Sequence, residues 1–415
     1  MIIVNEYIQK GTVKYWRAIA SLFLGSFVAF GVECFVQPII PVLAENFKLT
    51  PMTAGLAMSF ATMGMAVSML LIAGFAKKLN RKYTMTVALL ISSLLAIGVS
   101  VSPDFQLILE IRALQGFLLA GYPALALVYI NEEFEPAVIG RVVGFYVAGI
   151  TIGGLVGRLV ISVLTDYVSW RVGIGSVGLI YVLISVLFYF ALPAAKNKPA
   201  AGRQSVPIWE NIKETFTNTK LWGIYGIAFL IFGAFTCIYN YITYIFMAAP
   251  YNLSQTLIGF IFLMYVFGTI GSAVLGRMSD QYGNGRILCF GLMIMIVGVT
   301  LTLATSLIIK IFGLAILTFG FFGSHSAACS WAGKIASFKI KASALSLYMF
   351  FYYVGGSAIG AVGGVFLKNY GWTGIILMVI LLLIGALALC FQLTFSQLLI
   401  YEQNDMRNLK KAVQN

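Results

Sequence analysis

The chain has 415 residues, of which 60% are hydrophobic and only 10% are charged, with a formal net charge of +13. A soluble domain carries about 25% charged residues and a disordered chain is poor in apolar residues, so this composition excludes both classes. The apolar runs are long and unbroken, which excludes an outer-membrane barrel built from short alternating segments. We therefore predict an all-α integral membrane protein.

Segments long enough to cross a bilayer follow one another along the chain. A membrane-spanning helix needs about 20 predominantly apolar residues. The sequence predicts twelve such spans, at residues 16–43, 51–76, 83–102, 105–130, 142–165, 172–193, 221–249, 254–276, 287–308, 311–333, 342–367 and 374–400. The longest polar gap separates six spans from six. We expect a six-helix bundle over 1–193, a cytoplasmic linker over 194–220, a second six-helix bundle over 221–400 and a cytoplasmic tail over 401–415.

The basic residues lie mostly on one side of the predicted spans. Of the 27 lysines and arginines, 21 fall on the side that holds both termini and the linker. Because short basic loops stay in the cytoplasm, we expect cytoplasmic termini in a multi-pass protein of a bacterial cytoplasmic (inner) membrane. The positive charge is thus explained by topology, and no nucleic-acid partner is expected.

The two halves of the chain carry similar landmarks at a nearly constant spacing. Gly153 and Gly355 are 202 residues apart, as are Trp170 and Trp372. We interpret this spacing as an internal duplication. It predicts two pseudo-symmetric bundles that rock about a site near the middle of the membrane.

The turn between spans 8 and 9 carries the clearest motif, Gly276-x-x-x-Asp280-x-x-Gly283-x-x-Arg286. Asp280 is suited to accept hydrogen bonds from helix N-terminal amides, and Gly283 permits a turn with positive φ. Arg286 is suited to bind carbonyls or a carboxylate of the neighbouring bundle. The motif resembles the loop signature of the major facilitator superfamily, and the resemblance covers essentially the whole chain. It implies the two-bundle facilitator fold and a transport function.

The first-half copy of this motif departs from the family pattern. Lys77 stands where the second half has Asp280, and Asn80, which tolerates a left-handed turn, stands where it has Gly283. The missing acid is expected from the end of span 4. We predict conformational latches formed by Asn80, Arg81, Glu132, Glu133, Arg141, Asp280, Gly283 and Arg286. The alternative is that these are solvated loop charges.

Two further motifs lie inside spans. Arg112-x-x-Gln115-Gly116 in span 4 resembles a superfamily signature whose arginine is implicated in coupling in proton-driven members. Span 5 resembles the family's glycine-rich antiporter signature, with Gly153-Gly154 where Gly-Pro is usual. Small residues at this spacing let helices approach closely, so we expect packing roles for Gly149, Gly153, Gly154 and Gly157. Through stretches 36–43, 153–158 and 346–372 the chain is similar to bacterial YnfM-like permeases, which are grouped with twelve-span drug and sugar efflux transporters.

Three charged residues lie deep inside predicted spans, namely Glu33, Arg112 and Arg158, whereas Arg17 and Glu110 lie near span ends. A charge deep inside a span costs about 2.5–3.5 kcal/mol on insertion scales. At about 1.5 Å per residue the three share nearly one depth, and we predict that Glu33 faces Arg112. Glu33 is then a candidate proton-binding group, and the alternative is a structural ion pair. Two arginines against one carboxylate favour an anionic or zwitterionic cargo at Arg158.

His325, the only histidine, lies within span 10 between Ser324 and Ser326. Imidazole titrates near neutral pH, which makes His325 a candidate proton carrier. The alternative is a neutral ring bonded to a serine or a carbonyl. No second metal ligand has a suitable spacing, so no metal is expected. We also expect no cofactor and regard the proton as the coupling ion.

Polar and aromatic residues gather in the second half of the chain. Tyr241 and Tyr244 share a helical face, as do Tyr348 and Tyr352. Such surfaces suit an amphiphilic ligand, although packing is the alternative for most of them. The predicted cargo contacts are Gln37, Gln115, Arg158, Asn240, Tyr241, Tyr244, Trp331, Tyr348 and Tyr352.

These observations favour a secondary active transporter that works as a monomer. We expect proton-coupled alternating access and export of a drug-like, sugar-like or amphiphilic small molecule. One alternative is an uptake symporter or uniporter for a polar or anionic metabolite. A second alternative is a lipid or glycolipid translocase, which apolar gaps between spans 5 and 8 would favour. No nucleophile and base pair or nucleotide loop is present in the sequence, so enzymatic activity is not expected.

Overall fold

The computed structural model describes residues 7–75, 79–195, 214–337 and 340–414. Within these ranges the regular secondary structure is helical, apart from one isolated backbone bridge between Ile8 and Phe134. The elements are α1 (Val13–Cys34), η1 (Gln37–Ile39), α2 (Ile40–Asn46), α3 (Pro51–Phe75), α4 (Arg81–Val101), α5 (Phe105–Leu119), α6 (Gly121–Glu133), η2 (Pro136–Val138), α7 (Ile139–Tyr167), α8 (Trp170–Ala191), α10 (Thr219–Met247), α11 (Gln255–Ile261), η3 (Phe262–Met264), α12 (Tyr265–Tyr282), α13 (Asn284–Leu301), α14 (Leu307–Ile335) and α15 (Lys341–Gln414).

Twelve membrane spans account for these elements in the described part of the chain. Eleven helical segments are long and apolar enough to cross a bilayer, and the last of them covers 55 residues, Lys341–Phe395. At about 1.5 Å per residue that segment is far longer than one bilayer core. Gly371, with φ 64° and ψ −161°, breaks it into two helices. The predicted spans 11 and 12 therefore lie on either side of Gly371.

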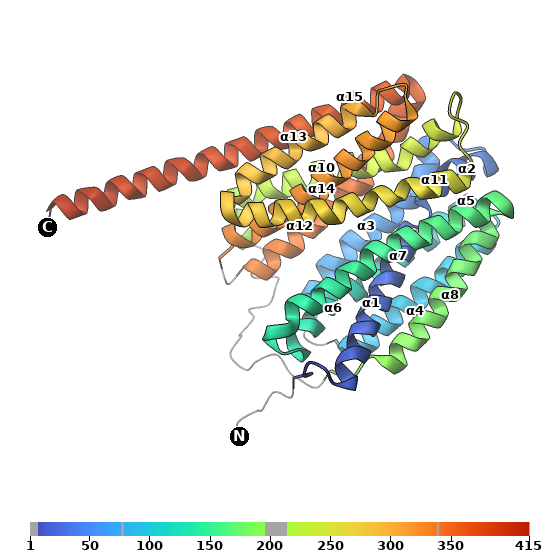
Figure 1. The fold of residues 1–415 in the computed structure, drawn as a ribbon, viewed down its shortest axis with the longest axis horizontal. Coiled ribbons are helices and arrows are strands. Elements are labelled where there is room, and N and C mark those ends of the chain that lie inside the picture. Colours follow the sequence, from blue (N-terminus) through green and yellow to red (C-terminus); the bar gives the residue numbers. More distant parts are fainter. Residues whose placement is uncertain (1–6, 76–78, 196–213, 338–339, 415) are drawn as a thin grey trace.

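The region expected to be a linker falls mostly on residues 196–213, which lie outside the described residues. Over the expected tail, the helix that follows Gly371 continues to Gln414 (Figure 1). The proposed limits at 193, 220 and 400 otherwise stay predictions.

The first span is broken about two thirds of the way along. Pro38 and Pro41 each lack the N–H that an unbroken helix would use, so α1 ends at Cys34, and η1 and α2 complete the crossing. The break leaves carbonyl groups at the end of α1 without intrahelical partners. No lipid can supply those partners at this depth, so another part of the protein must do so.

The internal duplication is visible in matched helix contacts. A Cβ at Gly153 would overlap the carbonyl of Phe27, and a Cβ at Gly355 would overlap the carbonyl of Phe229. Phe27 and Phe229 are separated in the chain by the same number of residues as Gly153 and Gly355, and this number is the spacing of the internal repeat. The two halves thus use one packing device, in which a glycine lets two helices meet at backbone distance.

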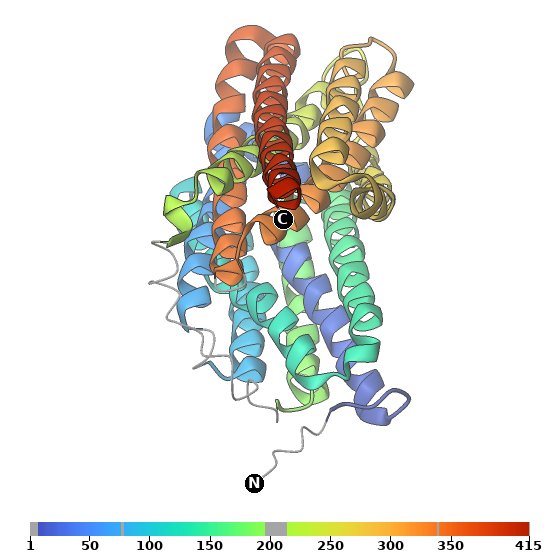
Figure 2. The ribbon, with the colours of Figure 1, turned by 90° about the vertical axis from the view of Figure 1, so that its left-hand side faces the viewer.

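The two halves converge at one end of the molecule. Figure 1 shows α2, α5 and α11 close together, whereas α6 and the C-terminal end of α12 diverge at the opposite end of the molecule (Figures 1 and 2). We call the end where α2, α5 and α11 lie together the far end, and we call the opposite end the linker end. Ser59 in α3 and Ser357 in α15 exchange hydrogen bonds of 2.9 and 2.8 Å across the halves. Asp166 in α7 accepts bonds from the main chain and hydroxyl of Thr256 in α11.

Candidate functional site

Arg112 binds the broken end of α1. It is completely buried, and its Nη atoms donate to the carbonyls of Val32, at 3.0 Å, and Glu33, at 2.6 Å. Its Nε donates to the carbonyl of Ala57 in α3, at 3.0 Å. A cation near a helix C-terminus also interacts favourably with the helix dipole. Arg112 thus supplies the partners that the break in α1 requires, and it joins three spans of the first half.

The predicted pairing of Glu33 with Arg112 is wrong for the carboxylate. Arg112 contacts Glu33 through the main chain, and no hydrogen bond or ion pair of the Glu33 side chain occurs among the described residues. The side chain is 4% exposed. The reason is geometric: the broken end of α1 presents main-chain carbonyls, and Arg112 uses its Nη donors on them. Among the described residues Glu33 is therefore a buried acid without a cation within 4.0 Å, and Arg158 and Arg112 act on it electrostatically from farther away.

Gln115 does not present a free amide to a cargo, contrary to its predicted role. Its Oε1 accepts from Arg112, at 2.5 Å, and its Nε2 donates to the carbonyl of Ser92 in α4, at 2.7 Å. Both ends of the amide are used within the first half. Gln115 orients Arg112 instead.

A chain of three polar side chains crosses between the halves. Arg158 Nη2 donates to Gln37 Oε1 at 2.8 Å, and Gln37 Nε2 donates to Asn240 Oδ1 at 3.0 Å. All three side chains are buried. Because the guanidinium can only donate, it fixes the orientation of the Gln37 amide and, through it, that of Asn240. We call Arg158, Gln37 and Asn240 the relay.

Aromatic rings of the second half surround the Arg158 guanidinium. Its Cζ lies 4.7 Å from the ring centre of Phe262 and 4.6 Å from that of Tyr265, and these cation–π contacts partly offset the burial of a charge. Nη1 donates to the carbonyl of Gly154 at 3.0 Å. A cavity of 20 Å³ adjoins Arg158 and is lined by Phe30, Ile150, Thr151, Gly154, Tyr265 and Phe322. It lies at the seam between α7 and α12.

The second half contributes a continuous aromatic cluster. Phe235 stacks on Phe321 at 3.9 Å between ring centres, and Phe232 stacks on Tyr352 at 3.8 Å. Tyr265 packs edge-on against Phe235. The predicted cargo residue Tyr352 belongs to this cluster and is partly exposed. The phenylalanines and Tyr265 were not predicted, because aromatic residues within spans carry no signal that separates a lining position from a packing position.

His325 is held by a tyrosine and not by a serine or by the carbonyl of another residue. The Tyr348 hydroxyl lies 3.0 Å from its Nδ1, and the ring lies 4.7 Å from that of Tyr352. Tyr348 is fully buried. The expected pair of Tyr348 and Tyr352 on one face is present, but only Tyr352 has an exposed surface.

Two other predicted cargo residues lie in the protein interior. Tyr241 is fully buried and donates to the carbonyl of Gly360 at 2.8 Å. Trp331 is 3% exposed and lies against Gly285 of α13. These residues pack helices together and do not line an open surface. Tyr244 is partly exposed, and its hydroxyl lies 3.5 Å from the carbonyl of Ile40 in the opposite half.

The first-half latch uses an acid from the end of span 4. Arg81 donates from Nε and Nη2 to the two carboxylate oxygens of Glu132, at 3.1 and 3.0 Å. This bidentate pair joins the start of α4 to the end of α6. Glu133 is buried beside it, and its carbonyl accepts from the main chain of Ile8. Asn80 does not form a left-handed turn: with φ −72° it caps α4 by accepting from the Tyr83 amide.

The second-half latch differs from the prediction. Asp280 accepts from Lys334 of α14 at 3.4 Å and not from helix amides, because it lies in the last turn of α12, where no free amide points toward it. Gly283 adopts the expected positive φ, 92°. Arg286 and Arg141 are exposed and have no hydrogen bond or ion pair among the described residues. The inter-bundle contact predicted for Arg286 is absent there.

The glycines of α7 lie on its face toward α1. A Cβ at Gly149 would overlap Ser26, and one at Gly157 would lie 2.5 Å from the Tyr181 hydroxyl. Gly154 is less crowded, with Phe30 at 3.0 Å. This face carries α7 close enough to α1 for Arg158 to reach Gln37.

Comparison with known proteins identifies the family. The model of the Major Facilitator Superfamily matches residues 22–247 and 227–398. The chain belongs to the major facilitator superfamily. It is 36% identical to the MFS-type transporter YybF of Bacillus subtilis, over 92% of this chain and 94% of that protein. It is 33% identical to the inner membrane transport protein YnfM of Escherichia coli, over 92% of each chain.

Solved structures with the facilitator fold superpose on the whole molecule. A bacterial homologue of the human lysosomal transporter Spinster, in an inward-facing and unoccupied conformation, matches with a TM-score of 0.75, 15% identity and coverage of 93% and 98% of the two chains. The nucleoside transporter NupG matches with a TM-score of 0.75, 13% identity and coverage of 91% and 99%. The chain is therefore a multi-pass membrane transporter with the two-bundle facilitator fold.

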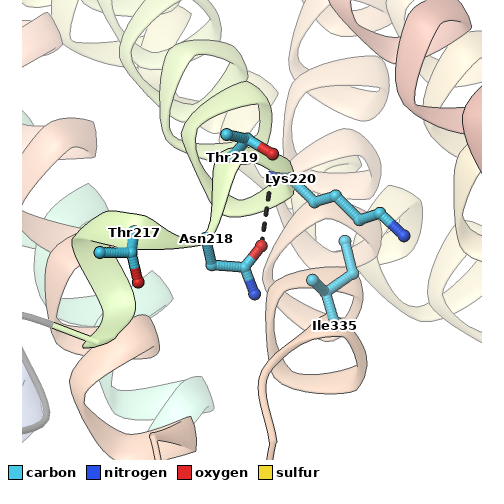
Figure 3. A pocket seen from close by; sticks show the side chains of 5 residues that line it. All are labelled: Thr217, Asn218, Thr219, Lys220 and Ile335. Atoms are coloured by element: carbon cyan, nitrogen blue, oxygen red, sulfur yellow. Dashed lines mark hydrogen bonds between the residues drawn. The ribbon is translucent and has the colours of Figure 1, made fainter.

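The linker end of this facilitator holds a second cavity, of 410 Å³. Thr217, Asn218, Thr219 and Lys220 line it at the start of α10, and Ile335 lines it at the end of α14 (Figure 3). The main chain of Lys220 donates to Asn218 Oδ1 at 3.2 Å, which caps α10. This cavity is wide but remote from the buried charges, so we place the candidate site at Glu33, the relay and the aromatic cluster.

Proposed function

We propose that the protein is a proton-coupled efflux antiporter for a small amphiphilic molecule, in a bacterial cytoplasmic membrane. The excess of basic residues at the linker end favours a cytoplasmic position for that end and for both termini. The far end is then the outer face, and this conformation is closed outward. We further propose that the transporter works as a monomer.

The observation that carries this proposal is the burial of Glu33 without a hydrogen bond or ion pair among the described residues, with Arg158 and Arg112 acting on it only from farther away. An ionised carboxylate buried without a partner is costly, whereas its neutral acid is not. The conformation in which Glu33 is unpaired therefore favours a proton bound to Glu33. A conformation in which a cation approaches Glu33 favours release of that proton. This difference between conformations is what coupling to a proton gradient requires. Arg112 serves this cycle by holding the broken end of α1 that carries Glu33.

A vesicle assay tests the proposal. Purified protein is reconstituted in liposomes with a pH-sensitive dye inside, a pH gradient is imposed, and candidate cargoes are added. We expect cargo-dependent proton flux that Glu33→Gln abolishes. Glu110→Gln is the matched control, because Glu110 is an exposed acid in α5. Flux that is unchanged in Glu33→Gln would contradict the role of Glu33.

The proposed direction of transport has one alternative with structural support. Arg158 has no acidic partner within 4.0 Å among the described residues, which also suits an uptake symporter or uniporter for an anionic metabolite. Gene deletion separates the two directions, since loss of an exporter raises cellular cargo and loss of an importer lowers it. A lipid translocase is disfavoured, because the cavity between spans 5 and 8 is 20 Å³, about the space of one water molecule.

A further inference from the structure

The two buried arginines differ in how fully their donors are used. Every nitrogen of Arg112 has a hydrogen-bond acceptor. Arg158 is 2% exposed, but its Nε has no acceptor and no carboxylate lies within 4.0 Å in the described ranges. One arginine is thus committed to structure. The other retains a donor that no described group satisfies, and Glu33 acts on its charge only from beyond 4.0 Å.

The relay ends on a second unused donor. Gln37 donates to Asn240 Oδ1, which leaves Asn240 Nδ2 pointing away from Gln37. That nitrogen is buried and has no acceptor among the described residues. Gly360 of α15 adjoins it, and a Cβ there would lie 3.4 Å from Nδ2. A group with acceptor oxygens would satisfy Arg158 and Asn240, whereas a cationic group would satisfy neither.

The aromatic cluster lies between these donors and the linker end. His325 lies closest to that end, in the part of α14 that leads to Ile335. Phe235 lies near the middle of α10, which begins at Thr219, and Arg158 lies deeper still in α7, which begins at Ile139. Because depth along a helix grows by about 1.5 Å per residue, a molecule entering from the linker end passes the rings before it reaches the guanidinium. Tyr352 and His325 are partly exposed along this path.

We infer that Arg158 binds the carboxylate of an organic monoanion whose apolar or aromatic body lies against the ring cluster. We specify a single negative charge because only one guanidinium among the buried charges, that of Arg158, is available to pair with a carboxylate. The inference rests on the proposed transport function and names its cargo class. In the present conformation the head-group position is closed by Tyr265 and Phe262, and the bound anion takes the place of these ring contacts.

Binding to purified protein in detergent tests the inference without any proton gradient. Three probes share one body: 3-phenylpropionate, 3-phenylpropionamide and 3-phenylpropylammonium. Thermal stabilisation is measured over a concentration series. Because a hydrogen bond to a charged group is roughly twice as strong as a neutral one, we expect 3-phenylpropionate to bind roughly tenfold more tightly than the amide. The ammonium compound should bind least.

Variants separate recognition from structure. Arg158→Gln should remove the preference for the anion, and Arg158→Lys should keep the preference at lower affinity, because lysine retains the charge but not the planar fork. The Lys variant also covers the case in which the Gln variant does not fold. Arg277→Gln, at an exposed arginine without a partner among the described residues, should match the wild type.

Equal binding of the three probes, no binding of any of them at about 10 mM, or an anion preference that survives in Arg158→Gln would overturn the inference. None of these results bears on Glu33. Conversely, loss of proton coupling in vesicles with anion binding intact would remove the antiport mechanism and leave the cargo class standing.

Discussion

Gln37 of the first half and Asn240 of the second half bind each other, and they lie within one residue of equivalent positions in the two repeats. They are 203 residues apart in the chain, and a hydrogen bond of 3.0 Å joins Gln37 Nε2 to Asn240 Oδ1. Contact between nearly equivalent positions places this pair at the interface of the two halves. The pair lies between the halves near the far end, so it must break whenever the halves separate there.

Weakening this pair should open the far end. A buried hydrogen bond contributes about 0.5–1.5 kcal/mol, so Gln37→Ala should shift the conformational equilibrium roughly twofold to tenfold toward the far-end-open state. Cys34, 4% exposed in this conformation, reports the shift in a background where the other four cysteines are replaced by serine. We expect faster labelling by a membrane-impermeant maleimide from the far side. Gln106→Ala, at an exposed far-end amide, is the control, and equal rates in all variants would contradict the gating role.

Arg112→Gln should destabilise the fold, in contrast to Glu33→Gln. The substitution leaves the carbonyls of Val32 and Glu33 unsatisfied, at about 1–3 kcal/mol each. We expect a Tm several degrees below that of the wild type, measured by the monodisperse fraction after heating. Glu33→Gln removes no side-chain hydrogen bond of this conformation and should keep the wild-type Tm. An unchanged Tm for Arg112→Gln would show that the carbonyl contacts are dispensable.

The two latches should differ in energy. Arg81 and Glu132 have side chains that are 9% and 15% exposed and form a bidentate pair. Lys334 and Asp280 are 53% and 75% exposed, at 3.4 Å. Double-mutant cycles with alanine, read from unfolding stability, should give a coupling of about 1 kcal/mol for the first pair and about zero for the second. Equal couplings would contradict the assignment of the first pair as the structural latch.

Two glycines of α7 should respond in opposite ways to alanine. Gly153→Ala places a Cβ against the Phe27 carbonyl. Because a backbone carbonyl cannot move aside as a flexible side chain can, α7 and α1 must separate, and the Tm should fall. Gly144→Ala meets nothing within 4 Å and gains helix propensity of up to about 1 kcal/mol, so its Tm should stay or rise. Tolerance of alanine at Gly153 would show that the close approach of α7 and α1 is not required.

The sequence alone determined the architecture of this protein. Hydropathy and length placed twelve spans, because a bilayer fixes how many apolar residues a helix needs. The spacing of Gly153 and Gly355 revealed the duplication, and the structure reproduces it in the contacts of both glycines with α1 and α10. The buried charges Glu33, Arg112 and Arg158 were also evident, because apolar spans make each charge conspicuous.

Only the tertiary structure decided what those charges contact. Depth along a helix follows from residue number, but the direction of a side chain depends on helix rotation and on where a neighbouring helix ends. Arg112 therefore binds the carbonyls beside the Pro38 break and not the Glu33 carboxylate, and Arg158 reaches across to Gln37. Tyr241 and Trp331, polar aromatics like Tyr352, became packing residues for the same reason: which face of a span meets protein is set by how the twelve helices pack, and no single span encodes it.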